Sequence, residues 1–305
     1  MNRLQVELLG RQLKNPLFAA SGTFAFGLEA AQIQDTKAWA GIVCAAITAE
    51  PRVGNPLPRV AETHCGMLNA VGLENPGIET FIKDILPDVR HVTDYVVLNL
   101  AGNHLDDYRL LVDRTTEAYE AGLVDALEIN LSCPNVSTGC MAIGTRAHEI
   151  EAIVKDLRKR TKAPLWIKLT PNVTHIDEMA LAAEAAGADA VSLVNTFLGM
   201  KIDVRRKRPV LANRTGGLSG PAIRPIAVRM VHDVAQAVKI PVIGMGGIEK
   251  VEDILEFLLA GATCVQLGTY NLRNPFGIDS LLNELKDWLE AEDACITDYI
   301  GALEL

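Results

Sequence analysis

The chain has 305 residues, of which 49% are hydrophobic and 22% are charged, and its formal net charge is −9. This composition is ordinary for a globular protein, and the negative charge argues against nucleic acid as a partner. No apolar run approaches the ~18 residues of a membrane span, and the N-terminus lacks the apolar core of a signal peptide. We therefore expect a cytoplasmic protein that does not associate with membranes.

The chain contains six cysteines and six histidines. The cysteines, at positions 44, 65, 133, 140, 264 and 295, form no C-x-x-C pair and show no iron–sulfur spacing. The histidines show no H-E-x-x-H or similar pattern. We expect reduced thiols, as in a reducing compartment, and no bound metal.

Apolar runs of strand length alternate with longer helical patterns along the chain. The candidate strands are apolar on both faces, as parallel strands covered by helices are. They are Leu17–Ala20, Gly41–Thr48, Tyr95–Leu100, Ala126–Leu131, Leu165–Leu169, Ala190–Asn195, Val242–Met245 and Cys264–Gly268. The helical patterns are Glu79–Arg90, Leu105–Ala121, Arg146–Arg160, Ile176–Ala186, Pro221–Val238, Lys250–Ala260 and Asp279–Glu292. This alternation predicts an α/β fold, a (β/α)8 TIM barrel, with residues 1–305 forming a single domain.

Three further features lie outside this alternation. Gln5–Leu8 and Arg11–Leu13 predict a small N-terminal β-hairpin that caps the bottom of the barrel. Two insertions, Pro51–Pro76 and Phe197–Gly220, predict long loops at the C-terminal face, where active sites of this fold lie. The second insertion contains the basic run Arg205–Arg208, which we interpret as a solvated loop.

A cysteine follows the fourth predicted strand, in the run Asn130-Leu131-Ser132-Cys133-Pro134-Asn135. Most isolated cysteines are small, buried, apolar residues. Here the thiol lies just past the end of a strand, between two asparagines and next to a proline. This setting favours a base or a nucleophile, and we expect Cys133 to be catalytic.

A lysine lies inside the fifth predicted strand, in Trp166-Ile167-Lys168-Leu169-Thr170. A buried lysine is costly unless it meets an anion or a carbonyl, although one near a strand end can also extend to solvent. The functional interpretation is a cation that faces the polar edge of a cofactor ring. The N1/C2=O edge of a flavin gains negative charge on reduction, and a fixed cation would stabilise it.

Three glycine clusters follow late strands of the predicted barrel: Gly216-Gly217-Leu218-Ser219-Gly220, which we expect to open the helix after strand six, Gly244-Met245-Gly246-Gly247, and Gly268-Thr269. Each alone is typical of a turn. Together, at successive strand ends, they favour a phosphate site. A Rossmann motif is excluded because Glu249 stands where its third glycine is needed, and no P-loop is present.

Carboxamides gather at the predicted strand ends. They are Asn69, Asn99, Asn130 and Asn195, with Thr196 and Asn135 beside them. Each asparagine alone is typical of a cap or turn, but a carboxamide offers both donors and an acceptor. Such a group at one mouth suits a planar heterocycle with alternating C=O and N–H groups.

These residues together resemble the catalytic subunit of the class 1B dihydroorotate dehydrogenases, nearly end to end. The matching segments are Ala20-Ser21-Gly22, Glu50-Pro51-Arg52-x-Gly54-Asn55-Pro56-x-Pro58-Arg59, Asn69-Ala70-Val71-Gly72-Leu73-x-Asn75-Pro76-Gly77, Asn130 to Asn135, Lys168-Leu169-x-Pro171-Asn172, Asn195-Thr196-x-x-Gly199-Met200-x-Ile202-Asp203 and the three glycine clusters. The resemblance implies an FMN-containing barrel that oxidises (S)-dihydroorotate to orotate in pyrimidine biosynthesis.

The resemblance also implies roles for individual residues. Cys133 is the expected base, which removes the proton α to the C4 carbonyl while a hydride passes to FMN N5. The expected FMN contacts are Ser21, Ala46, Asn99, Asn130, Lys168, Val194, Gly220, Gly246, Gly247, Gly268 and Thr269. The expected substrate contacts are Asn69, Ala70, Val71, Gly72, Leu73, Asn130, Asn135, Asn195 and Thr196.

Partners are implied by the resemblance as well. We expect a separate electron-transfer subunit that carries FAD and a 2Fe–2S cluster and passes electrons to NAD. Two catalytic and two electron-transfer subunits would form a heterotetramer around a homodimer of this chain.

One position departs from the family pattern. The family has a lysine beside the flavin and the acidic end of the substrate where this chain has Ala45, in Cys44-Ala45-Ala46-Ile47-Thr48. A nearby cation such as Arg52 compensates, or the enzyme is weakened, or the chain is an FMN-dependent paralogue that acts on another dihydropyrimidine-like substrate. A non-catalytic phosphate-binding barrel or partner subunit is the remaining alternative.

Overall fold

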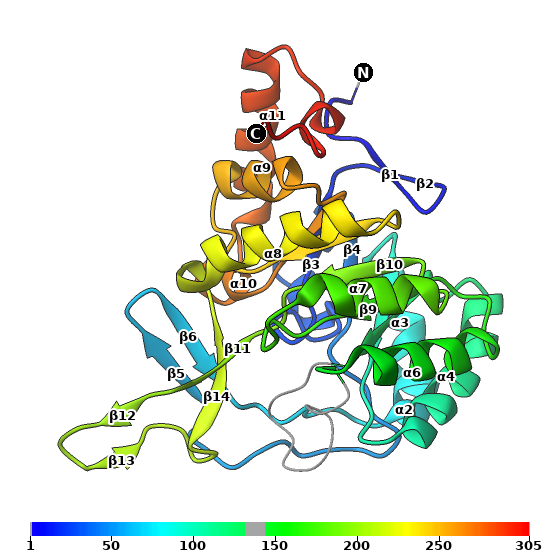
Figure 1. Ribbon diagram of the computed structural model, residues 1–305, viewed down its shortest axis with the longest axis vertical. Coiled ribbons are helices and arrows are strands. Elements are labelled where there is room, and N and C mark those ends of the chain that lie inside the picture. Colours follow the sequence, from blue (N-terminus) through cyan, green and yellow to red (C-terminus); the bar gives the residue numbers. More distant parts are fainter. Residues whose placement is uncertain (1, 132–143, 305) are drawn as a thin grey trace.

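Eight parallel strands close into a barrel in this computed structural model, which describes residues 2–131 and 144–304 (Figure 1). The order around the barrel is β10-β15-β16-β3-β4-β7-β8-β9. The strands are β3 (Leu17–Ala19), β4 (Gly41–Val43), β7 (Val96–Leu100), β8 (Ala126–Asn130), β9 (Leu165–Lys168), β10 (Ala190–Leu193), β15 (Val242–Met245) and β16 (Cys264–Leu267). The predicted TIM barrel is confirmed, and each strand starts within one residue of its expected position.

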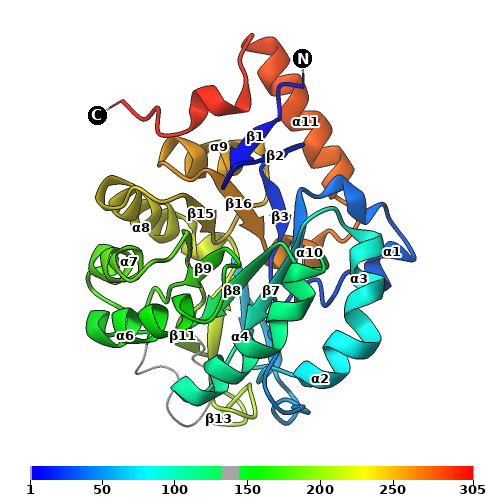
Figure 2. The same ribbon diagram turned by 90° about the vertical axis from the view of Figure 1, so that its right-hand side faces the viewer.

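Helices surround the barrel (Figure 2). The longer ones are α4 (Leu105–Glu120), α6 (Ala147–Arg158), α7 (Ile176–Ala185), α8 (Arg224–Ala237), α9 (Val251–Leu259) and α11 (Ile278–Ala291). Shorter ones are α1 (Leu28–Ala31), η1 (Thr36–Ala38), η3 (Pro221–Ile223), α10 (Thr269–Arg273) and η4 (Ile296–Tyr299). None of the helices in the described part of the chain combines the length and apolar character needed to cross a bilayer.

The predicted helix Glu79–Arg90 is divided into three parts. It consists of α2 (Ile78–Thr80), the π-helix η2 (Phe81–Ile85) and α3 (Leu86–Val92). Pro87 lies at the start of α3 and has no N–H to donate to the carbonyl four residues earlier. A widened π turn before the proline accommodates the missing hydrogen bond.

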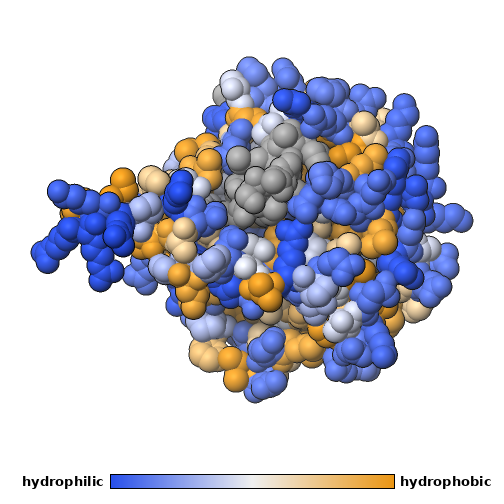
Figure 3. Space-filling view, turned by 90° about the horizontal axis from the view of Figure 1, so that it is seen from below, coloured by the Kyte–Doolittle hydropathy of each residue, from blue (hydrophilic) through white to orange (hydrophobic). Residues whose placement is uncertain are grey.

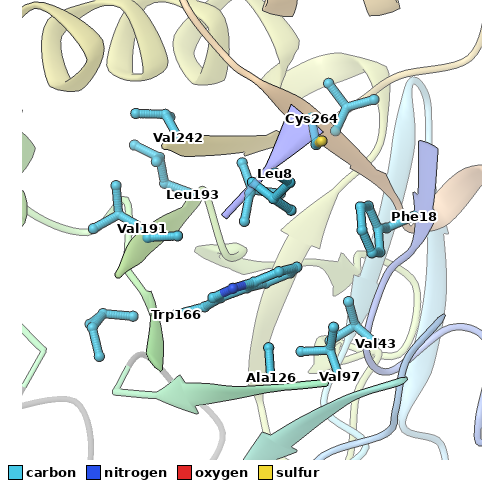
Figure 4. Close-up of a cluster of buried hydrophobic side chains, with 14 of the residues drawn as sticks. Leu8, Phe18, Val43, Val97, Ala126, Trp166, Val191, Leu193, Val242 and Cys264 are labelled. Carbon is cyan, nitrogen blue, oxygen red and sulfur yellow. The ribbon is translucent and has the colours of Figure 1, made fainter. Parts of the chain in front are cut away.

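The lower half of the barrel interior is apolar (Figure 4). Trp166 is fully buried there, with its ring centroid 5.6 Å from that of Phe18 and 6.1 Å from that of Tyr95. Successive inward residues of a strand are two positions apart, so Lys168 follows Trp166 in the next layer, as Asn99 follows Val97, Glu128 follows Ala126 and Gln266 follows Cys264. That layer is polar and comprises Asn99, Glu128, Lys168, Ser192 and Gln266, all buried. The barrel therefore has an apolar base and a polar upper interior.

The predicted N-terminal hairpin is confirmed. Strands β1 (Val6–Leu8) and β2 (Arg11–Leu13) pair antiparallel. Leu8 is only 1% exposed and packs at the bottom of the barrel (Figure 4).

The two predicted long loops are wrong in part, because the insertions form an antiparallel sheet. Its order is β11-β14-β6-β5, with β5 (Val60–Thr63), β6 (Gly66–Asn69), β11 (Phe197–Met200) and β14 (Thr215–Ser219). The pairing of β6 with β14 joins segments far apart in the sequence, and glycines hide the strand pattern. A Cβ on Gly216 would lie 2.6 Å from the Asn69 carbonyl oxygen, so close strand approach requires glycine there.

The prediction that the whole glycine cluster before the helical pattern Pro221–Val238 opens that helix is therefore corrected. Residues up to Ser219 belong to β14, and only Gly220 stands before the turn that opens the helix. The second insertion also carries a short pair, β12 (Ile202–Asp203) with β13 (Arg208–Pro209). This pair forms a hydrophilic arm that projects from the molecule (Figure 3), and its residues Arg205–Arg208 are exposed, as predicted.

Candidate active site

A cavity of about 460 Å³ opens at the carboxyl ends of the barrel strands, beside the insertion sheet. Ten predicted cofactor residues line it: Ser21, Ala46, Asn130, Lys168, Val194, Gly220, Gly246, Gly247, Gly268 and Thr269. Predicted substrate residues line it too: Asn69, Val71, Gly72, Leu73, Asn130, Asn195 and Thr196. The cavity thus brings together residues from both ends of the chain.

Four predicted residues are not among those lining the cavity. Asn99 and Ala70 are fully buried behind the lining. Asn99 lies below Asn130, whose Nδ2 donates to Asn99 Oδ1 at 3.4 Å. Cys133 and Asn135 lie outside the described residues.

The floor of the cavity rests on a buried carboxylate, Glu128 of β8. Its Oε1 accepts hydrogen bonds from Ser192 Oγ and Gln266 Nε2, both at 2.8 Å. Its Oε2 accepts one from Asn99 Nδ2 and lies 3.3 Å from Lys168 Nζ. Five strands (β7, β8, β9, β10 and β16) therefore meet at one carboxylate.

The charge state of Glu128 follows from these contacts. Burial would raise the pKa of its carboxyl, but the ammonium of Lys168 and the donors on Gln266, Ser192 and Asn99 lower it more. The pKa is held below its ordinary value, so the group is ionised at neutral pH. Glu128 and Lys168 form a buried ion pair.

Glycines at the other end of the cavity bring the backbone close to its interior. Gly246 and Gly247 have φ of +133° and +85°, and a Cβ on Gly247 would lie 2.7 Å from the Gly220 carbonyl oxygen. In the described part of the chain, no backbone acceptor binds the N–H of Gly246 or Gly247. Thr269 Oγ1 adds a hydroxyl, which donates to Ser219 Oγ at 2.8 Å. Exposed N–H groups in a narrow backbone turn are suited to hold a phosphate.

Amides and a hydroxyl form the wall beneath the insertion sheet. Asn195 Oδ1 accepts from the backbone N–H of Thr196 at 2.8 Å, and Asn172 Nδ2 donates to the Thr196 carbonyl at 3.1 Å. Asn69 Nδ2 donates to the Gly217 carbonyl at 3.4 Å. These hydrogen bonds hold the three asparagine side chains in fixed positions, and together they make this wall of the cavity polar.

The segment from Asn69 to Leu73 closes one side of the cavity. Asn55 Nδ2 donates to the Ala70 carbonyl at 2.9 Å, and Asn75 Nδ2 donates to the Leu73 carbonyl at 2.7 Å. Gly72 and Leu73 have φ of +84° and +58°. Side-chain bonds to carbonyls fix this tight turn, so its backbone is presented to the cavity in one shape.

The comparison with known proteins agrees with these motifs. A family model described as dihydroorotate dehydrogenase matches residues 3–289. The chain belongs to the dihydroorotate dehydrogenase family. This family consists of flavin-dependent oxidoreductases, and the chain is an enzyme of that class. The resemblance predicted from the sequence motifs is confirmed.

Individual members of the dihydroorotate dehydrogenase family match along most of their length. The "Dihydroorotate dehydrogenase B (NAD(+)), catalytic subunit" of Bacillus pumilus (strain SAFR-032) is 49% identical over 288 residues, 94% of this chain and 92% of the relative. The protein of the same name from Bacillus cereus (strain AH187) is 50% identical over 290 residues, 95% and 93% of the two chains. A crystal structure of DHODH from Eimeria tenella in complex with ferulenol has a TM-score of 0.79 at 21% identity. The match covers 99% of this chain and 89% of the Eimeria tenella chain. At this identity, the similarity supports the barrel fold and carries no conclusion about function.

Ala45, where this chain departs from the dihydroorotate dehydrogenase pattern, lines the cavity with Ala25 and Ala46. It follows the inward residue Val43 by two positions, so a longer side chain there would point into the cavity. Arg52, considered as a substitute cation, is not among the lining residues. The wall at Ala45 is therefore apolar.

Lys168 and Glu74 are the ionisable residues among the described residues that line the cavity. Glu74 pairs with Arg59, and Lys168 pairs with Glu128. A second cation facing the cavity is thus absent from the described lining.

The sequence did not predict the ion pair of Glu128 with Lys168 or the hydrogen-bond donors around Glu128. The strand pattern predicts Glu128, Ser192 and Gln266 only as parts of buried strands. The signal was present, because polar residues at inward positions of a barrel strand need partners. Which strands supply those partners is set by the stagger of the closed barrel, and a single sequence does not reveal it.

Proposed function

We propose that the chain, as one FMN-binding barrel domain spanning residues 1–305, oxidises (S)-dihydroorotate to orotate in pyrimidine biosynthesis. The observation that supports this most is the convergence on one cavity of glycine backbone, a buried lysine and a polar amide wall. Each of these parts suits one part of the reactants. The family to which the chain belongs supports the same reaction.

The residues present fit FMN. The backbone of Gly220, Gly246, Gly247, Gly268 and Thr269 would hold the phosphate. Lys168 would stabilise negative charge at the ring edge, while Ser21, Ala46, Asn130 and Val194 would surround the ring. Asn99 would act from behind the lining, by accepting the hydrogen bond of Asn130. FMN, when bound, supplies an acceptor for hydride at N5.

The chain's own residues would bind and deprotonate the substrate. Residues Asn69, Val71, Gly72, Leu73, Asn130, Asn135, Asn195 and Thr196 would orient the pyrimidine ring by hydrogen bonds and contact, with Ala70 supporting this segment from behind the lining. Cys133 would take the proton from the carbon α to the C4 carbonyl, so that the C–H electron pair forms the new C=C bond as hydride leaves the adjacent carbon. A free thiol titrates near ~8.5, so polar neighbours that lower this value would favour the thiolate.

Anaerobic reduction tests the reaction. Dihydroorotate is added to the FMN-loaded protein without oxygen, and the flavin absorbance is followed. We expect bleaching of the flavin band and formation of orotate in equal amount. A protein that purifies without flavin and rejects added FMN would contradict the proposal and favour a non-catalytic barrel.

A second candidate substrate is favoured by Ala45. The apolar wall there offers little to a substrate carboxylate, which fits a dihydropyrimidine-like substrate without one. Orotate titration separates the two: an unchanged flavin spectrum at millimolar orotate, with bleaching by a carboxylate-free dihydropyrimidine, would select this alternative. For dihydroorotate, Ala45→Lys should tighten orotate ~10- to 150-fold, since a charge-assisted hydrogen bond contributes roughly 1.5–3 kcal/mol.

We also propose a partner that receives the electrons. The names of the Bacillus relatives describe a catalytic subunit and NAD(+). An electron-transfer subunit with FAD and a 2Fe–2S cluster would link the flavin of this chain to NAD, in a heterotetramer built on a homodimer of this chain. Co-expression with such a subunit should yield dihydroorotate-dependent NADH formation, which the chain alone should lack.

A further inference from the structure

The carboxylate of Glu128 is placed to act on the cofactor site without touching it. Glu128 is fully buried and does not line the cavity, whereas Lys168, its partner at 3.3 Å, does. The two residues come from neighbouring strands, since β8 pairs with β9. Any influence of Glu128 on the cavity therefore passes through Lys168 or through the field of its charge.

The contacts of Lys168 show what Glu128 controls. Within residues 2–131 and 144–304, the Lys168 ammonium has Glu128 as its hydrogen-bond and ion-pair partner, at 3.3 Å. An ammonium has three donors, so two remain for a ligand in the cavity. The carboxylate thus fixes the direction of the ammonium and offsets its charge at the cavity floor.

The remaining contacts show that Glu128 is itself held rigidly. Ser192, Gln266 and Asn99 donate to its two oxygens, from three different strands. A fully satisfied carboxylate of this kind keeps one position and remains charged. A purely structural role would need no cation directed at the cavity, and apolar side chains of similar volume serve such a role at least as well.

We propose that Glu128 is a positioning residue that sets the oxidation–reduction equilibrium of the bound flavin through Lys168. This rests on the proposed binding of FMN but not on the identity of the substrate. Reduction adds negative charge to the flavin, and the unbalanced part of the Lys168 charge favours it. Glu128 offsets that charge, so it keeps the flavin harder to reduce than Lys168 alone would.

The test is the midpoint potential of FMN-loaded variants, measured by dye equilibration without any substrate. Glu128→Gln keeps the volume and removes the charge. We expect the ratio of reduced to oxidised flavin at fixed potential to rise about 15-fold, the effect of one unit charge at ~10 Å and an effective dielectric constant of ~20. For a two-electron couple this is a shift of about 35 mV to more positive potential.

Two further variants separate positioning from structure. Glu128→Asp keeps the charge but moves it one carbon–carbon bond from Lys168, and we expect a rise of about threefold in the same ratio. Ser192→Ala removes one neutral donor, leaves both charges, and should leave the ratio within about twofold of the unaltered protein. Thermal unfolding of each variant records the structural cost separately from the potential.

The outcomes are distinct. If Glu128→Gln folds, binds FMN and keeps the original ratio of reduced to oxidised flavin, the inference is overturned while the proposed function stands. The inference is also overturned if Ser192→Ala shifts this ratio as much as Glu128→Gln does. If Glu128→Gln does not fold, Glu128→Asp is compared with Ser192→Ala instead. An unchanged ratio of reduced to oxidised flavin in Glu128→Asp then overturns the inference. Failure of the unaltered protein to bind FMN overturns the proposed function and this inference together.

Discussion

Single residues carry the predicted base and the predicted phosphate site, and the two can be separated by substitution. The predicted base, Cys133, follows β8 in the sequence, whereas the glycines that suit a phosphate follow β15 and β16. A change at one group should therefore leave the other intact.

Cys133→Ala tests the predicted base. We expect the variant to keep its yellow flavin and to lose turnover by ~10²- to 10⁴-fold at neutral pH, the usual contribution of a positioned base. Flavin content and steady-state rate are the two measurements. Turnover close to that of the unaltered protein would rule out the base role.

Gly268→Ala tests the phosphate site. A Cβ at this position would lie 3.7 Å from Ala20 Cβ and 3.8 Å from Thr23 Cγ2, which is ordinary contact, so we expect the fold to accept it. The added methyl would occupy space that a phosphate needs. Loss of one charge-assisted hydrogen bond, roughly 1.5–3 kcal/mol, should raise the FMN dissociation constant ~10- to 150-fold. If the FMN affinity and the melting temperature are both unchanged, the phosphate does not bind at this strand end.

At the scale of secondary-structure elements, the insertion sheet positions the polar wall of the cavity. Strand β14 runs so close to Thr196, the residue before β11, that a Cβ on Gly217 would lie 2.0 Å from Thr196 Oγ1. The insertion sheet and the barrel therefore meet at a predicted substrate contact.

Gly217→Ala should displace Thr196 and weaken substrate binding. We expect KM to rise about tenfold, the loss of about 1.4 kcal/mol, while FMN content is retained. Gly199→Ala is the matched control in the same sheet, because its Cβ would meet the flexible end of Leu68 at 3.1 Å. Equal KM values for the two variants would argue against a role for Thr196 in binding.

The elements also show how far sequence reasoning reaches. The barrel strands were predictable because each is apolar on both faces, a property of the strand alone. The insertion sheet was not, because the pairing of β6 with β14 joins residues 67–69 to residues 217–219 and leaves no local pattern. The same holds for Glu128, whose donors come from strands that the barrel's closure brings together.

At the scale of the whole molecule, stability and chemistry occupy different layers of the barrel interior. The apolar base holds Trp166, Phe18 and Tyr95 in contact, and the polar layer above holds the Glu128–Lys168 pair. Substitutions in the base should change folding more than flavin chemistry.

Trp166→Ala tests this division. Removal of a fully buried indole should lower the free energy of unfolding by about 3–5 kcal/mol, as measured by urea denaturation. Trp288→Ala is the matched control, since Trp288 is 38% exposed on α11, and its loss should change the same quantity by about 1 kcal/mol or less. Similar losses for both tryptophans would show that the base is not the main source of stability.

The insertion sheet has a consequence for biosynthesis. The wall of the cavity needs β6 and β14, and its glycine end needs residues up to Thr269, so no nascent chain that stops short of that threonine contains the complete site. A ribosome-bound chain therefore has to emerge through Thr269 before it can retain a flavin. Flavin retention thereby requires synthesis beyond Thr269, and products truncated before that residue should remain colourless.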